Sequence, residues 1–294
     1  MAARYNLEAR YPEKPEIWDA RGSTTASDRD EKSDQYSRPR FANFLGADAI
    51  ISIHTNAATS TTARGFRAFA YNGRTQDVAL GNSIICYAKE IVQAQEAYKT
   101  YVFDSYARQS GLVENGEAQM SAILLETGFH TNPTDAAALA DPVFQEAAMK
   151  GIEKGYRLHR EGKPCQPFKT LSIANASGNH GTKVTVLVKT QGFPQGTVLG
   201  DVEITSCPPG TCNGSKGVAM NVVDGGFSWT FGCNSSKNTP TRVIGVRTTL
   251  YDADGVKTTP VDSTVTCTKP STSSSSSSSA NGDAPAAASF SDVM

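Results

Sequence analysis

Two ionisable side chains directly follow continuous apolar runs in the sequence. His54 follows AIISI (49–53), and Glu126 follows AILL (122–125). Neutral imidazole is among the commonest zinc ligands in proteins. A glutamate beside a bound metal can take a proton from a water molecule and pass it to a leaving group. The pair therefore indicates metal-assisted hydrolysis, with His54 as a zinc ligand and Glu126 as the catalytic proton carrier.

Structural roles compete with this interpretation, because a histidine or glutamate at a strand end is usually a hydrogen-bonded or ion-paired residue. His130, four residues after Glu126, is a further candidate for the same site. His159 lies on an apolar helical stripe and is expected to pack or to face solvent. His180, in SGNHGTK, is expected to occupy a turn.

The apolar pattern also predicts the elements that carry these residues. A continuous apolar run is typical of a strand buried on both faces of a parallel sheet, and this applies to 49–53 and 121–129. The segment GFRAFAY (65–71) alternates, which suits a strand nearer the edge of the sheet. Apolar residues at helical spacing predict helices over 77–93 and 142–159.

Strands that alternate with helices indicate an α/β domain, here residues 1–163, with a mostly parallel sheet flanked by helices. Ligands bind beyond the carboxyl ends of the strands in open sheets of this kind. Both His54 and Glu126 stand at such ends, so we expect them to meet there.

Other segments of this domain carry weaker signals. EIWDAR (16–21) suggests a short strand, and the polar segment 22–35 suggests a loop. RPRFANFLG (38–46) suggests a short helix that ends at Gly46. Cys86 falls inside the helix predicted over 77–93 and is expected to be a small residue beside the core.

Residues 164–270 follow a different pattern, with short strand-like runs separated by Gly, Pro and Asn turns. This pattern predicts a small all-β sandwich of immunoglobulin-like type, with Trp229 in its core. The expected strands are 183–190, 197–205, 226–233, 242–252 and 262–268. Residues 271–294 are rich in Ser and Ala and are expected to form a disordered tail.

Five of the six cysteines lie in the second half of the chain, which favours disulfides and an oxidising compartment. Cys207 and Cys212 could close a tight loop, and Cys233 with Cys267 is the preferred second pair. Cys165 is then left over, and the connectivity is open. We expect an extracytoplasmic location (periplasm, cell wall or secreted), with the signal peptide absent from this chain.

Composition excludes two classes of partner. The net charge is −1, which argues against binding nucleic acid through a general basic field. The sequence contains no window of 18 consecutive apolar residues, so we expect no membrane span.

Three segments resemble the catalytic domain of the zinc-dependent N-acetylmuramoyl-L-alanine amidases of the Amidase_3 type. They are SRPRFANFLGADAIISIHTNAA, RGFRAFAYN and SAILLETGFHTNPTDAAALADPVFQEAAMKGIEKGYRLH, and the resemblance covers about residues 16–160. The residues that match the motifs of the family, in order, are Arg38 or Arg40 with Ala42 and Asn43, then Ser52, His54 and Asn56, then Glu126, Gly128, Phe129 and Asn132.

Enzymes of this family cleave the amide between the lactyl group of N-acetylmuramic acid and the L-alanine of the peptidoglycan stem. The resemblance implies that His54 is a zinc ligand and that Glu126 handles the proton of the attacking water. It assigns Asn56 and Asn132 to bracing their loops rather than to the reaction.

The chain departs from the family in its metal ligands. Family members bind zinc with two histidines and a glutamate, and two of these three ligands precede the Ser-x-His-x-Asn motif. No histidine precedes His54. The segment around Glu8 resembles the end of the helix that follows the ligand glutamate of the family, so Glu8 does not match the ligand itself. We therefore expect an amidase domain that lacks its N-terminal part, binds Zn²⁺ poorly and hydrolyses peptidoglycan little or not at all.

Two other functions remain open at this point. The chain could be a non-catalytic peptidoglycan-binding or anchoring envelope protein derived from an amidase. It could also be a structural envelope protein whose α/β domain shares only the fold.

Overall fold

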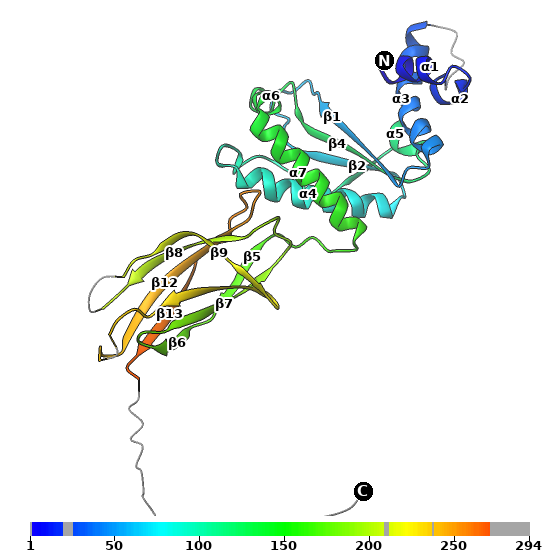
Figure 1. Cartoon of the computed structure of the whole chain (residues 1–294). Helices are drawn as coiled ribbons and strands as arrows, with labels where there is room; N and C mark the ends of the chain where they lie inside the picture. The colour runs from blue at the N-terminus through cyan, green and yellow to red at the C-terminus, as the bar shows by residue number, and fades with distance from the viewer. Residues whose placement is uncertain (1, 20–25, 209–211, 237, 271–294) are drawn as a thin grey trace, which may run out of the picture.

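The structure is a computed structural model that describes residues 2–19, 26–208, 212–236 and 238–270. The tail expected over 271–294 lies outside these residues. Helices and a sheet form the N-terminal part, and two further sheets form the C-terminal part (Figure 1).

The described residues of the N-terminal part form eight helical segments and four strands. Along the chain they are α1 (Ala2–Arg10), α2 (Pro15–Trp18), α3 (Ala26–Leu45), β1 (Ala49–Asn56), β2 (Arg67–Tyr71), α4 (Thr75–Ala94), the 3₁₀ helix η1 (Glu96–Tyr98), β3 (Arg108–Ser110), α5 (Val113–Gly116), β4 (Ser121–Phe129), α6 (Pro133–Ala140) and α7 (Pro142–Arg160).

The sheet of this part has the strand order β1-β4-β2-β3. β1 pairs with β4 and β2 with β3 in parallel, whereas the central pairing of β2 with β4 is antiparallel. The expected mostly parallel sheet is therefore present, with one antiparallel pairing. The expectation that 49–53 is buried on both faces is wrong, because β1 is an edge strand and Ile53 is 47% exposed.

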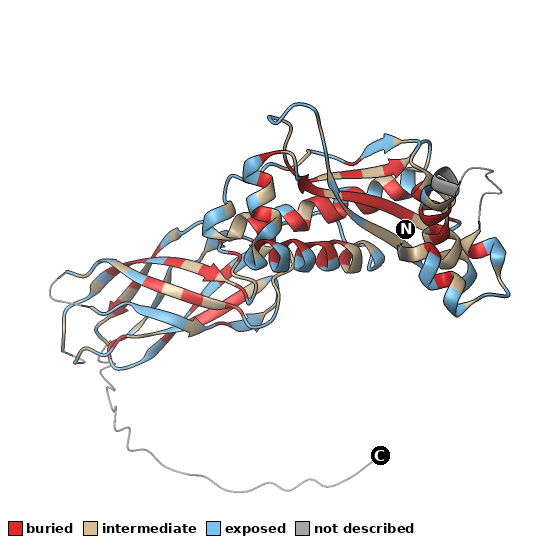
Figure 2. Cartoon of the chain, turned by 90° about the horizontal axis from the view of Figure 1, so that it is seen from above, coloured by how far each residue is buried: buried red, intermediate tan, exposed pale blue. Residues whose placement is uncertain are grey.

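Helices α4 and α7 pack against each other beside the sheet (Figure 1). Gly151 and Gly155 of α7 allow this packing, because a Cβ on Gly151 would lie 2.3 Å from the Cα of Ala88. α4 covers the face of β4 that carries Ile123, since a Cβ on Gly81 would lie 2.8 Å from Cδ1 of Ile123. Buried residues concentrate along this layer (Figure 2).

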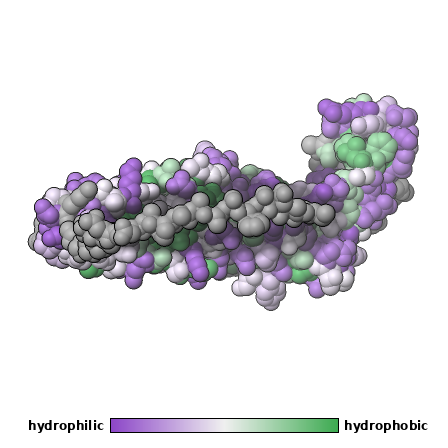
Figure 3. Space-filling model, turned by 60° about the horizontal axis from the view of Figure 1, so that its bottom comes forward, coloured by the Kyte–Doolittle hydropathy of each residue, from purple (hydrophilic) through white to green (hydrophobic). Residues whose placement is uncertain are grey.

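The N-terminal helices differ from the sequence expectation. Residues 15–18 form a helix rather than a strand, because Pro15 fixes the first helical position of α2. The segment expected to be a loop, 22–35, is helical from Ala26 onward, so 38–46 is only the second half of α3. Phe44 and Leu45 at the end of α3 are 47% and 59% exposed. Figure 3 shows a hydrophobic patch on the part of the molecule formed by the N-terminal helices.

The C-terminal part consists of two sheets, with the orders β10-β11-β7-β5 and β6-β13-β12-β8-β9. Alternation along β7 buries Val184, Val186 and Val188, and Trp229 is buried as expected. The strands are β5 (Lys169–Ile173), β6 (Ala176–Asn179), β7 (Lys183–Gln191), β8 (Leu199–Ser206), β9 (Ser215–Ala219), β10 (Asn221–Val223), β11 (Gly226–Gly232), β12 (Arg242–Tyr251) and β13 (Val261–Thr268).

Three disulfides are present, and they include both pairs expected from the sequence, Cys207–Cys212 and Cys233–Cys267. The third joins Cys86 to Cys165, so the expectation that Cys165 is left over is wrong, and Cys86 is a bridge residue rather than only a small residue beside the core. The segment that follows α7 runs back along α4 and brings the two Cα atoms to 6.0 Å.

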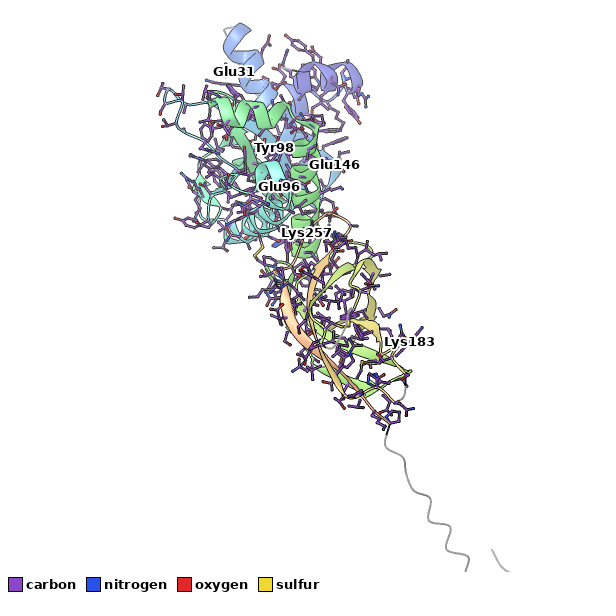
Figure 4. All side chains as sticks on the ribbon, turned by 90° about the vertical axis from the view of Figure 1, so that its left-hand side faces the viewer. Glu31, Glu96, Tyr98, Glu146, Lys183 and Lys257 are labelled. Atoms are coloured by element: carbon purple, nitrogen blue, oxygen red, sulfur yellow. A yellow bond between two sulfur atoms is a disulfide. The ribbon has the colours of Figure 1, made fainter. Side chains whose placement is uncertain are left out.

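Polar contacts from α4 hold the segment that leads into the C-terminal part. The Tyr87 hydroxyl donates to the carbonyl oxygen of Pro164 (2.8 Å). One carboxylate oxygen of Glu90 accepts from the backbone N–H of Phe168 (2.6 Å), and the other accepts from Lys154 (2.7 Å). Lys257 of the second part lies at this junction (Figure 4). Among the described residues, no helix has the length and apolar character needed to cross a membrane.

Candidate active site

His54 and Glu126 occupy paired positions on β1 and β4. Paired residues on neighbouring strands point to the same face of a sheet. Because Ile123 points toward α4, its alternation with Glu126 places Glu126 and His54 on the opposite face. The structure thus brings the two sequence-predicted residues together on one face, near the carboxyl ends of their strands.

A second glutamate, which no strand-end pattern marks in the sequence, contacts His54. Glu114 of α5 is buried, and its Oε2 lies 3.2 Å from Nε2 of His54. Its other oxygen forms an ion pair with Arg38, which also pairs with Asp34. α3 and α5 therefore supply a chain of alternating charges that ends at the imidazole.

The surroundings shift the pKa values of all three ionisable groups. Burial raises the pKa of Glu126, with a further contribution from the charge of Glu114, and the positive charges of His54, His130 and Arg67 oppose the rise. The hydrogen bond with Glu114 raises the pKa of His54 against the effect of its own burial.

Burial also acts to raise the pKa of Glu114, but bonds from His54 and Ser52 and the charge of Arg38 outweigh it and leave this pKa lowered. At neutral pH these directions favour an ionised Glu114 facing His54. The raised pKa of Glu126 and the lowered pKa of Glu114 mean that Glu126 has the higher affinity for a proton.

Arg67 extends the row of charged residues across a third strand. It is paired with Glu126 on the antiparallel neighbour β2, so its side chain lies on the same face. The residues His54, Glu126 and Arg67 therefore follow one another across β1, β4 and β2. The alternation of apolar residues over 65–71 predicts the strand that carries Arg67 but not its register with the neighbouring strand.

The motif asparagines bond to backbone around the site. The Asn132 side chain accepts from the N–H groups of Thr134 and Asp135 at the start of α6 and donates to the carbonyl oxygen of Thr61 (2.7 Å). Asn56 accepts from the N–H of Ala57. These contacts attach the loop after β1 to the carboxyl end of β4.

Asp135 gives this loop a second attachment. It is fully buried, and its Oδ2 accepts from the backbone N–H groups of Gly65 (2.6 Å) and Phe129 (3.0 Å). On the other side of the site, Asn43 of α3 bonds to the backbone of Glu117 and Gln119, ahead of β4.

The remaining candidates have different positions. His130 is exposed, and its Nδ1 lies 3.1 Å from the Thr55 hydroxyl oxygen at the end of β1. His159 is in the last turn of α7. His180 is in a turn, as expected, but is buried with its Nε2 3.0 Å from the carbonyl oxygen of Pro240. Glu8 pairs with Arg4 on α1.

A catalytic zinc site needs three protein ligands. His54 and Glu114 are two donors at a suitable mutual distance. Within the described ranges, no group of three His, Cys, Asp or Glu side chains could hold a metal ion. The residues on this part of the chain therefore do not form a complete zinc site.

Comparison with known proteins shows what this part of the chain is similar to. The model of the family described as N-acetylmuramoyl-L-alanine amidase (Amidase_3) matches residues 19–157. Residues 19–157 of the α/β part, slightly less than half of the 294-residue chain, are thus similar to this family.

Curated relatives are similar over the same part. A probable cell wall amidase LytH of Staphylococcus saprophyticus is 26% identical over 138 residues, which are 47% of this chain and 43% of the relative. LytH of Staphylococcus aureus is 24% identical over 115 residues, which are 39% of this chain and 36% of the relative. The chain thus spans less than half the length of these relatives.

Solved structures of amidases are similar at low identity. One is the N-acetylmuramoyl-L-alanine amidase of Clostridium difficile 630, with 24% identity, a TM-score of 0.39 and coverage of 44% of this chain and 67% of that one. Another is the CwlD amidase of Clostridioides difficile in complex with the GerS lipoprotein, with 19% identity, a TM-score of 0.41 and coverage of 48% and 68%.

Proposed function

We propose that the α/β part of this chain hydrolyses the amide between the lactyl group of N-acetylmuramic acid and L-alanine in peptidoglycan. The observation that carries the proposal is the paired position of His54 and Glu126 on β1 and β4. The family and its curated cell wall amidases support the choice of substrate.

Glu126 is proposed as the catalytic residue. Its carboxylate takes a proton from a water molecule, whose oxygen adds to the carbonyl carbon of the amide. As the C–N bond breaks, the same carboxyl donates the proton to the departing nitrogen. The products are a lactyl carboxylate on the sugar and a free amine on L-alanine. The raised pKa of Glu126 suits both halves of this exchange.

Zn²⁺ is proposed as the cofactor, and His54 as its ligand. In this family the metal supplies Lewis-acid chemistry at the scissile amide. Glu114 is the second oxygen or nitrogen donor that the described residues offer. With two donors in place of three, the 294-residue chain is expected to bind zinc weakly and to work slowly.

The incomplete donor set favours one alternative. A domain that keeps the peptidoglycan site without a tightly held metal would act as a binding or anchoring module of the cell envelope. His54 would then serve as the hydrogen-bonded partner of Glu114 rather than as a ligand.

We propose that the protein is located outside the cytoplasm. Three disulfides support an oxidising compartment. We propose the divisions 1–163 for the amidase domain, 164–270 for an immunoglobulin-like sandwich and 271–294 for a Ser-rich tail. The packed interior between the two sheets of the second part supports the sandwich assignment.

The products of digestion test the proposed reaction. Purified peptidoglycan is incubated with the chain and added ZnCl₂, and the soluble fragments are analysed by mass spectrometry. We expect peptides with a free L-alanine amine and glycans that retain the lactyl carboxylate. Cleavage at a glycosidic or a peptide bond would contradict the proposal, and intact peptidoglycan with retained binding would support the alternative.

A further inference from the structure

Arg67 is a cation of the candidate site whose side chain has no polar partner among the described residues. Within the described ranges, its guanidinium group makes no hydrogen bond and no ion pair, and its Nε is buried without an acceptor. Arg38, on the same face of the sheet, is instead paired with both Asp34 and Glu114. A partly buried cation that makes no ion pair and no hydrogen bond is available to bind an acceptor from a ligand.

The position of the Arg67 side chain is restricted. Its guanidinium carbon lies 4.6 Å from the centre of the Phe129 ring, at the end of β4. Such a contact orients the planar group and reduces the rotamer freedom that binding would otherwise remove. Arg67 is therefore held beside the end of the strand that carries Glu126.

Glu126 also has a polar atom without a partner. Its Oε2 is buried and has no hydrogen-bond partner among the described residues. The two side chains stand on adjacent strands, which lie about 4.7–4.9 Å apart, and they are paired across the ladder. A group that contacts the Glu126 carboxyl therefore comes within reach of the Arg67 side chain.

We propose that Arg67 is a substrate-binding residue that binds the oxygen atoms of the lactyl group of N-acetylmuramic acid. The inference rests on the proposed function, which places the scissile nitrogen at Glu126. The carbonyl oxygen of the scissile amide gains negative charge as water adds to its carbon. After cleavage the same carbon carries a carboxylate, which a guanidinium binds with two parallel hydrogen bonds.

Two sugars that differ only in the lactyl group test this proposal. N-acetylmuramic acid carries the lactyl carboxylate, and N-acetylglucosamine lacks it. Binding of each to the full chain is measured by isothermal titration and by ligand-observed NMR. We expect the chain to bind N-acetylmuramic acid in clear preference to N-acetylglucosamine. Equal binding of the two sugars, or no binding of N-acetylmuramic acid, would overturn the proposal.

Three variants assign the effect to Arg67. Arg67→Met is expected to lower the affinity for N-acetylmuramic acid by about tenfold or more, because charge-assisted hydrogen bonds are lost. Arg67→Lys retains the charge without the planar fork, so its affinity should lie between the two. The control Arg108→Met removes an exposed arginine on β3 that forms an ion pair with Asp104. This variant should bind N-acetylmuramic acid like the wild type.

The thermal midpoint of each variant is recorded alongside, and Arg67→Lys serves as the test if Arg67→Met does not fold. Unchanged affinity in the folded Arg67 variant would overturn the proposal. Its failure is distinct from failure of the proposed function, because binding is measured without cleavage. If the chain cleaves the amide but binding does not depend on Arg67, only this inference is rejected. If binding depends on Arg67 but no amide is cleaved, only the proposed hydrolase activity is rejected.

Discussion

Nε2 of His54 and Oε2 of Glu114 lie 3.2 Å apart, although 60 positions separate the two residues in the chain. Two ligands of one tetrahedral zinc ion, each about 2.0–2.1 Å from the metal, would lie roughly 3.3 Å apart. A direct hydrogen bond gives nearly the same distance. The geometry therefore suits either a two-donor metal site or a direct contact, and zinc binding distinguishes the two.

Weak zinc binding is the first prediction. The purified chain should retain clearly less than one zinc per molecule after dialysis, because two donors hold the ion poorly. His54→Ala and Glu114→Gln should each reduce the remaining binding. Elemental analysis and isothermal titration measure both quantities. One tightly held zinc per chain, or residual binding that survives in His54→Ala, would be the contrary result.

The buried ion pair between α4 and α7 predicts a large loss of stability. Lys154 and Glu90 have side chains that are 1% and 4% exposed. Lys154→Met leaves the Glu90 charge uncompensated and should lower the free energy of unfolding by about 3–5 kcal/mol. Lys150→Met, on the same helix but half exposed, should cost less than about 1 kcal/mol. Urea denaturation compares the two, and equal losses would argue against the buried pair.

The disulfides should contribute unequally to stability. Cys86–Cys165 spans 79 positions, whereas Cys207–Cys212 spans 5. In the chain-entropy description a longer loop gives greater stabilisation, about 4–5 kcal/mol for the first bridge and about 2 for the second. Replacing each pair by serines and measuring the thermal midpoint tests the order. A larger loss from the Cys207–Cys212 pair would contradict it.

Tyr98 predicts a decline in stability at high pH. Burial and the hydrogen bond to Asp141 raise the pKa of Tyr98 to about 12. The folded state thus holds the phenol proton more tightly than the unfolded state, whose pKa is near 10. The contribution is complete below pH 10 and is lost as the pH rises through 12.

Asp141→Asn checks the cause of this shift. Asparagine can keep the N-cap of α7, where the Asp141 side chain accepts from the N–H of Val143. The absorbance of ionised tyrosine, with Tyr98→Phe as the reference, should show the pKa of Tyr98 moving back toward 10. An unchanged titration curve would mean that Asp141 does not contribute.

Sequence periodicity predicted the elements with strong apolar patterns. The helices α4 and α7 and the strands β4 and β7 were all expected, because their apolar residues recur at 3.6 or 2 positions or run continuously. α3 was missed over its first half, since a segment so rich in charged residues lacks an apolar stripe. The edge position of β1 was also missed, because an apolar run does not report how many neighbours a strand has.

The candidate site was predictable only where residues stand at strand ends. His54 and Glu126 met this condition, and their pairing follows from parallel strands of matching length. Glu114 lies in a four-residue helix, and only the tertiary fold brings it to His54. Arg67 depends on the antiparallel register of β2 with β4, which alternation alone does not fix.

The disulfide partner of Cys86 was also not predictable from the sequence pattern. Periodicity placed Cys86 correctly in a helix, but the path of the chain after α7 decides what lies beside it. Disulfide connectivity follows from such long-range contacts and not from local spacing.

The rate of amide cleavage by Glu126→Gln tests the central claim most directly. Wild-type chain and variant are incubated with peptidoglycan and added ZnCl₂, and the release of L-alanine amines is followed over time. Glutamine keeps the shape of the side chain but cannot exchange the proton, so the rate should fall by about 10²–10⁴-fold while binding to peptidoglycan is retained. Release at the wild-type rate by the variant, or no release by either protein, would contradict the assignment of this site as an amidase that works through Glu126.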